Sequence, residues 1–216
     1  MDYQIIYSNR KTLSLQINRS AELIVRAPHK LSNKEIALFV NEKADWISKK
    51  IDFVEGNTPI KPNYLFGEQF LYLGLEYPLT LGTEKGEQLN FDGKTFELSG
   101  DGTSAFHRWY KAAFMKIAVP RVEYYAELYQ FNYKNIRLKS QKTLWGSCSA
   151  NNNINLNYLL IAAPISVIDY VIVHELSHIT HKNHSKDFWQ LVESILPNYK
   201  AEKQWLKIHG HRLHNL

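Results

Sequence analysis

The chain has 216 residues, of which 44% are hydrophobic and 22% charged, a balance that is ordinary for a soluble globular protein. This length can bury one good core, arranged as a single body or as two lobes. The single cysteine, Cys148, excludes an internal disulfide and suits a reducing compartment, where we expect it to be a packed strand residue.

The first residues contain no apolar signal core. The longest apolar stretch, residues 158–173, contains Pro164 and Asp169 and is too short to cross a membrane. We therefore expect a cytoplasmic protein with no membrane partner.

The first half of the chain predicts a small β-rich lobe with one helix, residues 1–103. Hydrophobic residues alternate over 13–17 and 23–25, which is typical of antiparallel strands. The capping box from Ser32 to Glu35 begins a helix reaching about Ile51. Its expected core face is Ile36, Phe39, Val40, Ile47 and Ile51. A loop over 55–63, with Pro59 and Pro62, precedes short strands over 65–98, and the lobe is expected to end at 101–104.

The second half, residues 104–216, begins with an aromatic-rich helix over about 106–131, which Pro120 is expected to kink. We expect its aromatic side chains to pack on the core rather than to stack on nucleic-acid bases. A strand near 135–138 and a hairpin of 145–148 with 154–157 follow. The hairpin either pairs its edge with extended substrate or only closes the sheet.

The most informative motif is His174-Glu175-Leu176-Ser177-His178, an H-E-x-x-H inside a predicted helix over 165–182. An apolar stripe on this helix faces the core, and Pro164 suits its first turn. Two imidazoles four residues apart lie one turn above each other and can bind one metal ion. Glu175 beside them can accept a proton from a metal-bound water.

A catalytic zinc needs a third protein ligand and one open position. His184 is favoured, because Asn183 can end the helix and the chain can then fold back toward the metal. The resulting H-E-x-x-H-x5-H has the ligand spacing of the metzincin motif, with His181 in place of its glycine. Glu193 from a later helix and His181 remain alternatives, although His181 lies too far along a straight helix.

The chain resembles the YgjP-like family of zinc-dependent hydrolases and, more distantly, the SprT/Spartan-like proteases. The matching pieces are 145–148 (WGSC), Asn157, 169–170 (DY), the H-E-x-x-H, 183–184 (NH) and 188–189 (FW). The similarity extends along nearly the whole chain and is strongest from Arg137 to Trp189. The resemblance implies zinc on His174, His178 and His184, with Glu175 as the base.

Charge adds one indication about partners. The net charge is +5, and residues 128–168 contain no Asp or Glu but do contain Lys134, Arg137, Lys139 and Lys142. The rim of the metal cleft can thus be positive and favour anionic substrates, such as a nucleotide or a protein held on nucleic acid, although a solvated strand face is the simpler interpretation.

We therefore predict an α+β fold with a zincin-like catalytic half and a zinc-dependent metallopeptidase acting on protein or peptide. The alternatives are a nucleoside triphosphate pyrophosphatase, a nucleic-acid-directed protease of Spartan type, and a binding protein with a closed zinc site. The sequence indicates no oligomeric state.

Overall fold

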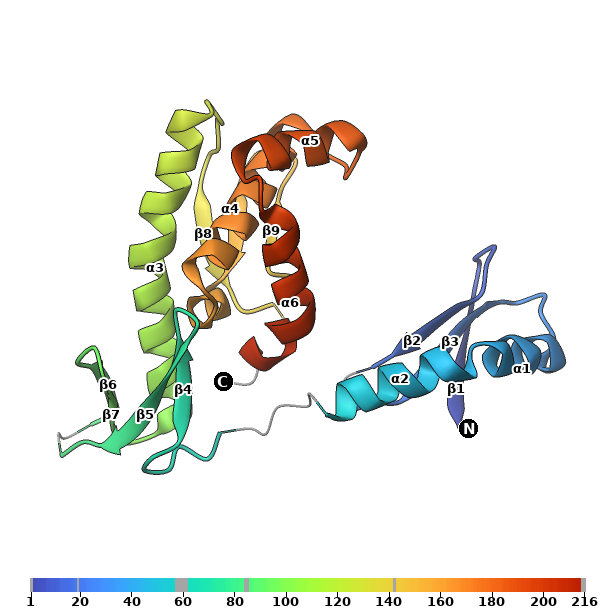
Figure 1. The fold of residues 1–216 in the computed structure, drawn as a ribbon, viewed down its shortest axis with the longest axis horizontal. Coiled ribbons are helices and arrows are strands. Elements are labelled where there is room, and N and C mark those ends of the chain that lie inside the picture. Colours follow the sequence, from blue (N-terminus) through green and yellow to red (C-terminus); the bar gives the residue numbers. More distant parts are fainter. Residues whose placement is uncertain (1, 19, 57–61, 84–85, 142, 215–216) are drawn as a thin grey trace. The chain divides into compact units, whose positions relative to one another are not determined.

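The computed structural model describes residues 2–18, 20–56, 62–83, 86–141 and 143–214 (Figure 1). Contacts between residues divide the chain into two units, 1–60 and 61–216. This division differs from the lobe boundary expected at 101–104, because the small sheet before that boundary shares a hydrophobic core with the helix after it. Most of the loop expected over 55–63 lies outside the described residues, and so does Lys142.

The first unit is a three-stranded sheet with two helices. Strands β1 (Tyr3–Ser8), β2 (Ser14–Ile17) and β3 (Leu23–Pro28) lie in the order β1-β3-β2, with β2 antiparallel to β3 as expected. Strand β1, which was not anticipated, pairs with β3 in parallel. Alternate residues of β3, Leu23, Val25 and Ala27, are buried and form the sheet side of the core.

The single helix expected over 32–51 is two helices, α1 (Asn33–Glu42) and α2 (Ala44–Glu55). The capping box is confirmed, since Ser32 accepts from the Glu35 N–H and Glu35 accepts from the Ser32 N–H. The break falls at Lys43, whose ψ of 14° leaves the helical range. It lets Ile36 and Ile47, one from each helix, pack in the same core as β3.

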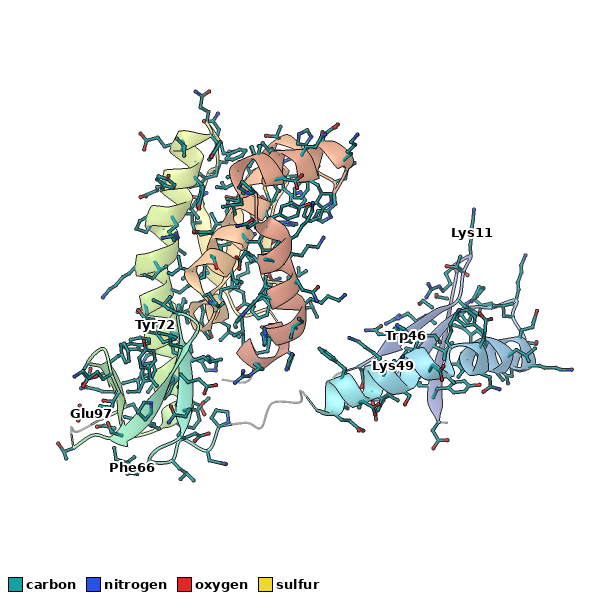
Figure 2. All side chains as sticks on the ribbon, in the orientation of Figure 1. Lys11, Trp46, Lys49, Phe66, Tyr72 and Glu97 are labelled. Atoms are coloured by element: carbon teal, nitrogen blue, oxygen red, sulfur yellow. The ribbon has the colours of Figure 1, made fainter. Side chains whose placement is uncertain are left out.

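In the second unit, a four-stranded sheet packs against the start of a long helix. Strands β4 (Gln69–Tyr72), β5 (Leu75–Leu81), β6 (Gln88–Phe91) and β7 (Phe96–Ser99) lie in the order β4-β5-β7-β6. Tyr72 lies among aromatic rings at this end of the helix, in contact with Phe91 and Trp109 (Figure 2). This shared core explains why the sheet belongs with the second half of the chain.

The long helix, α3 (Gly102–Leu128), is capped by Asp101 and continues on both sides of Pro120. Tyr110 and Phe114 of this helix are fully buried, which confirms that these aromatic residues belong to the core. Tyr124, by contrast, is 59% exposed.

The remaining elements surround the H-E-x-x-H helix. Strands β8 (Ile136–Lys139), β9 (Gly146–Cys148) and β10 (Ile154–Asn157) lie in the order β8-β10-β9, which makes β9 an edge strand. The hairpin of β9 and β10 is antiparallel, as predicted. A 3-10 turn (Tyr158–Ala162) leads into α4 (Ile165–Thr180), followed by α5 (Lys186–Ile195) and α6 (Tyr199–Leu213) (Figure 1).

The described residues therefore form a mixed α+β fold, as the sequence predicted. None of the described helices is both long and apolar enough to span a membrane.

Candidate metal centre

Helix α4 carries the H-E-x-x-H motif and is buried along most of its length. The predicted apolar stripe is confirmed, because Ile168, Ile172 and Leu176 are fully buried. The helix ends at Thr180, two residues earlier than expected, and Pro164 is its N-cap rather than a first-turn residue. Its C-cap is His181 in an extended conformation, so the expectation that Asn183 ends the helix is wrong.

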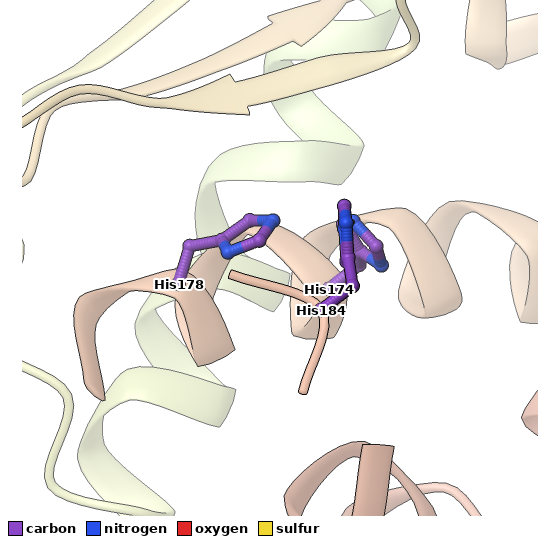
Figure 3. Close-up of side chains that lie close together, drawn as sticks. All are labelled: His174, His178 and His184. Atoms are coloured by element: carbon purple, nitrogen blue, oxygen red, sulfur yellow. The ribbon is translucent and has the colours of Figure 1, made fainter. Parts of the chain in front are cut away.

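The turn after α4 brings His184 to the two histidines of the motif. One ligand atom from each of His174, His178 and His184 can be chosen so that all three lie within 4.8 Å of one another (Figure 3). The Nε2 atoms of His174 and His184 are 3.0 Å apart. The three imidazoles thus converge from α4 and from the segment that follows it.

Aromatic side chains of α5 hold this turn against α4. Ser185 caps α5 by accepting from the Phe188 N–H. The Phe188 ring lies 5.0 Å from His174 and 4.6 Å from His178, and Trp189 stacks on His184 at 5.6 Å. These contacts restrict the orientations that the imidazoles can adopt.

A backbone carbonyl fixes the proton of one candidate ligand. His178 Nδ1 lies 3.0 Å from the carbonyl oxygen of His181. A carbonyl can only accept, so Nδ1 carries a proton, and Nε2 is the nitrogen through which His178 can bind a metal. His181 therefore serves the centre through its backbone, a role that a pattern of side chains does not reveal.

The environment keeps the other two imidazoles neutral. Burial, with smaller effects from His178, His184 and Lys203, lowers the pKa of His174 to about 3. Burial, followed by His178 and Lys203, also lowers the pKa of His184. Neutral imidazole is the form that binds a metal ion. Three converging imidazole nitrogens match the donor set that zinc takes in catalytic sites, so the residues fit a bound zinc.

Glu175 is buried beside the histidines, at 5% exposure, and lies against the edge strand β9. Burial raises its pKa to about 8, and a hydrogen bond from the Cys148 backbone N–H partly opposes the rise. A Cβ on Gly146 would lie 2.6 Å from the Glu175 side chain, so only glycine lets β9 approach this closely. Neither contact can be inferred from the motif alone.

The alternative third ligands lie elsewhere. The His181 side chain does not belong to the histidine cluster, although its carbonyl supports His178. Glu193 is exposed on α5 and pairs with Lys200 at 2.9 Å. Tyr170 contacts the His174 ring at 5.9 Å, and burial raises its pKa to about 12.

A cavity of about 360 Å³ adjoins His174 and Glu175 and continues between α4, α6 and the residues leading into β9. Its walls include Trp145, Tyr170 and Lys203. The centre therefore has a neighbouring space for part of a substrate.

Comparison with known proteins identifies the family of the chain. No curated protein matches the chain. A solved structure, the crystal structure of the metallopeptidase zymogen of Pyrococcus abyssi abylysin, is 20% identical over 42% of this chain and 92% of that chain, with a TM-score of 0.38. The family model described as YgjP-like, metallopeptidase domain, matches residues 11–209. Because this match covers nearly the whole chain, the protein belongs to the YgjP-like metallopeptidase family.

Proposed function

We propose that the protein is a zinc-dependent peptidase in which His174, His178 and His184 hold the metal and Glu175 is the general base. The observation that carries this proposal is the convergence of three imidazoles beside a buried carboxylate. A set of three histidine ligands leaves one position of a tetrahedral zinc open, as catalytic sites require.

Zinc held there supplies Lewis-acid chemistry, since it makes water more acidic and polarises a carbonyl oxygen. Glu175 takes the proton of the attacking water and returns it to the leaving amine. To accept a proton Glu175 must be ionised, and a divalent cation beside it favours that form. The Cys148 N–H holds the carboxylate in place between these two proton transfers.

The edge of β9 suits an extended peptide. The Asn157 N–H donates to the Trp145 carbonyl, and the Ser149 N–H donates to the Asn153 carbonyl, so residues 145 and 149 face β10. By alternation, the backbone groups of Gly146 and Cys148 face away from β10, on the side where Glu175 lies. A peptide added along this edge would pass beside Glu175, which supports a peptide rather than a nucleotide as substrate.

The test is hydrolysis of an unbiased peptide mixture by the zinc-loaded chain, followed by mass spectrometry. We expect Glu175→Gln to keep zinc and fold but to lose turnover by roughly a thousandfold or more, because the base is removed. Loss of zinc in this variant would make Glu175 a ligand. Turnover of nucleoside triphosphates without peptide cleavage would overturn the proposal, and stimulation of cleavage by single-stranded DNA would make the enzyme Spartan-like.

A further inference from the structure

The cavity beside the metal centre has a charged wall that the proposed chemistry does not use. Helix α6 contributes Lys203, Leu206 and Lys207 to it, and α4 contributes Tyr170, His174 and Glu175 on the other side. Lys203 and Lys207 are four residues apart on a helix and therefore lie on one face. Both residues line the same cavity of about 360 Å³.

Neither lysine forms an ion pair with any residue in the described part of the chain. Lys200, one turn earlier on the same helix, differs because it pairs with Glu193 at 2.9 Å. The Lys203 Nζ instead lies 3.9 Å from the centre of the Trp189 ring. A cation over an aromatic face keeps N–H donors for a further acceptor.

The Lys203 charge also reaches the metal centre. The Trp189 ring under its Nζ stacks on the His184 ring at 5.6 Å, so a single aromatic side chain separates this ammonium from a candidate ligand. An anionic group bound to Lys203 would therefore lie close to the scissile bond of a peptide held at the centre. The cavity is next to the reaction, not on a remote surface.

The remaining walls fit a side chain that is apolar along its stem and charged at its tip. Trp145, Tyr170 and Leu206 supply the apolar surface. Among the described lining residues Glu175 is the only carboxylate, and it is already held by the Cys148 N–H. This apolar surface suits the methylene groups of an Asp or Glu side chain, which a polyphosphate lacks, so a side-chain carboxylate is favoured over a polyphosphate.

We propose that this cavity is a specificity subsite in which Lys203 and Lys207 bind the side chain of an Asp or Glu of the substrate, near the scissile bond. The inference rests on the proposed peptidase function and names its substrate class: peptides with an acidic residue at one fixed position.

The test measures binding, so that it does not depend on turnover. The full-length, zinc-loaded chain carrying Glu175→Gln is titrated with capped hexapeptides that differ only by Glu or Gln at one position, moved along the peptide. At one register we expect the Glu peptide to bind about fivefold more tightly, the size of effect expected from two exposed ion pairs, and to lose this advantage at high salt.

Variants assign the preference to the two lysines. Lys203→Met with Lys207→Met keeps the apolar stems and should reduce the Glu-to-Gln ratio to about one, while zinc content stays unchanged. Lys200→Met, on the same helix but outside the cavity, should keep the full ratio. Lys203→Arg should retain the preference, because the charge is conserved.

Three outcomes overturn the subsite: no peptide binding, equal affinity for Glu and Gln at every register, or a preference that survives the double lysine variant. Tighter binding of inorganic pyrophosphate than of any Glu peptide, lost in the same variant, would assign the cavity to phosphate and also overturn it. Cleavage by the wild-type chain is scored separately. Peptides that bind with the Glu preference but stay intact would refute the peptidase and leave the subsite standing.

Discussion

His174 and His178 together decide whether the centre can hold a metal at all. They come from consecutive turns of α4, and the His178 tautomer leaves Nε2 free to bind. We expect the purified chain to carry about one zinc, and the double variant His174→Ala with His178→Ala to carry none, because a single histidine cannot retain it. Elemental analysis after dialysis measures the difference. Equal zinc content in the two proteins would show that the metal is bound elsewhere.

The third ligand is tested by comparing three single variants. His184→Ala should lose zinc to a mild chelator, because removing one of three ligands weakens binding by orders of magnitude. His181→Ala should retain zinc, since the interaction with His178 uses the His181 backbone carbonyl. Glu193→Ala should also resemble the parent, because Glu193 pairs with Lys200 on the exposed side of α5. Zinc lost from Glu193→Ala but kept by His184→Ala would reverse the assignment.

Single residues differ in how far the sequence can predict their roles. His174 and His178 are four residues apart on one helix, so helical geometry alone brings them together. His184 needs a turn whose path depends on Phe188 and Trp189, and the spacing could only favour it. Lys203 comes from a later helix and reaches the centre only through tertiary packing, so no local pattern predicts it.

Between elements, an ion pair joins α3 to α4. Arg121 donates from two nitrogens to both carboxylate oxygens of Asp169, which is 8% exposed. Replacing Asp169 by Asn should lower the free energy of unfolding by about 1–3 kcal/mol, because a charged bidentate pair is broken at a mostly buried site. Lys200→Met, which breaks an exposed pair, should cost less than about 1 kcal/mol. Urea unfolding of the zinc-saturated proteins measures both changes. Equal losses of unfolding free energy would mean that the pair between α3 and α4 contributes no more than an exposed ion pair.

The close contact between β9 and α4 depends on glycine at position 146, which has no side chain. A Cβ at position 146 would approach the Glu175 side chain to 2.6 Å, so Gly146→Ala forces that carboxylate to move. We expect the variant to fold and bind zinc but to lose at least about tenfold in kcat, since misplacement of a catalytic group by about 1 Å is costly. Cys148→Ala, on the same strand, adds no atom and keeps its backbone N–H, so it should retain activity. An unchanged kcat in Gly146→Ala would show that the rate does not depend on the exact position of Glu175.

The boundaries of helices and strands were predicted well where residues close in sequence determine them. They were predicted poorly where packing against distant residues determines them. The Ser32 cap begins α1 as expected, because a side-chain oxygen and a nearby N–H suffice. No glycine or proline marks the break at Lys43 in the sequence. The break follows from packing two helices on one sheet. Strand β1 was missed because its partner in the sheet, β3, lies about twenty residues later and runs parallel.

At the scale of the whole chain, the two units have separate cores. One hydrophobic cluster contains only residues of the first unit, including Val25 and Ile47, and the other contains only residues of the second. The sequence could not identify this division, because Asp101 and Gly102 resemble a linker but begin α3. The lobe boundary expected there divides the sheet of β4–β7 from the helix that completes its core.

Separate cores predict that the second unit folds and binds metal by itself. All three candidate ligands, Glu175 and the lysine-lined cavity belong to residues 61–216, and so does every described side chain that contacts the histidine rings. We therefore expect a fragment of residues 62–216 to give a cooperative unfolding transition and to bind about one zinc per chain. Its metal affinity should lie within about threefold of that of the full chain, because no ligand or supporting contact is removed. Circular dichroism and competition with a chelator measure both properties. The matched control is the same fragment carrying His184→Ala, which should fold without retaining zinc. A fragment that unfolds, or that binds zinc far more weakly than the full chain, would show that residues 1–60 support the metal centre.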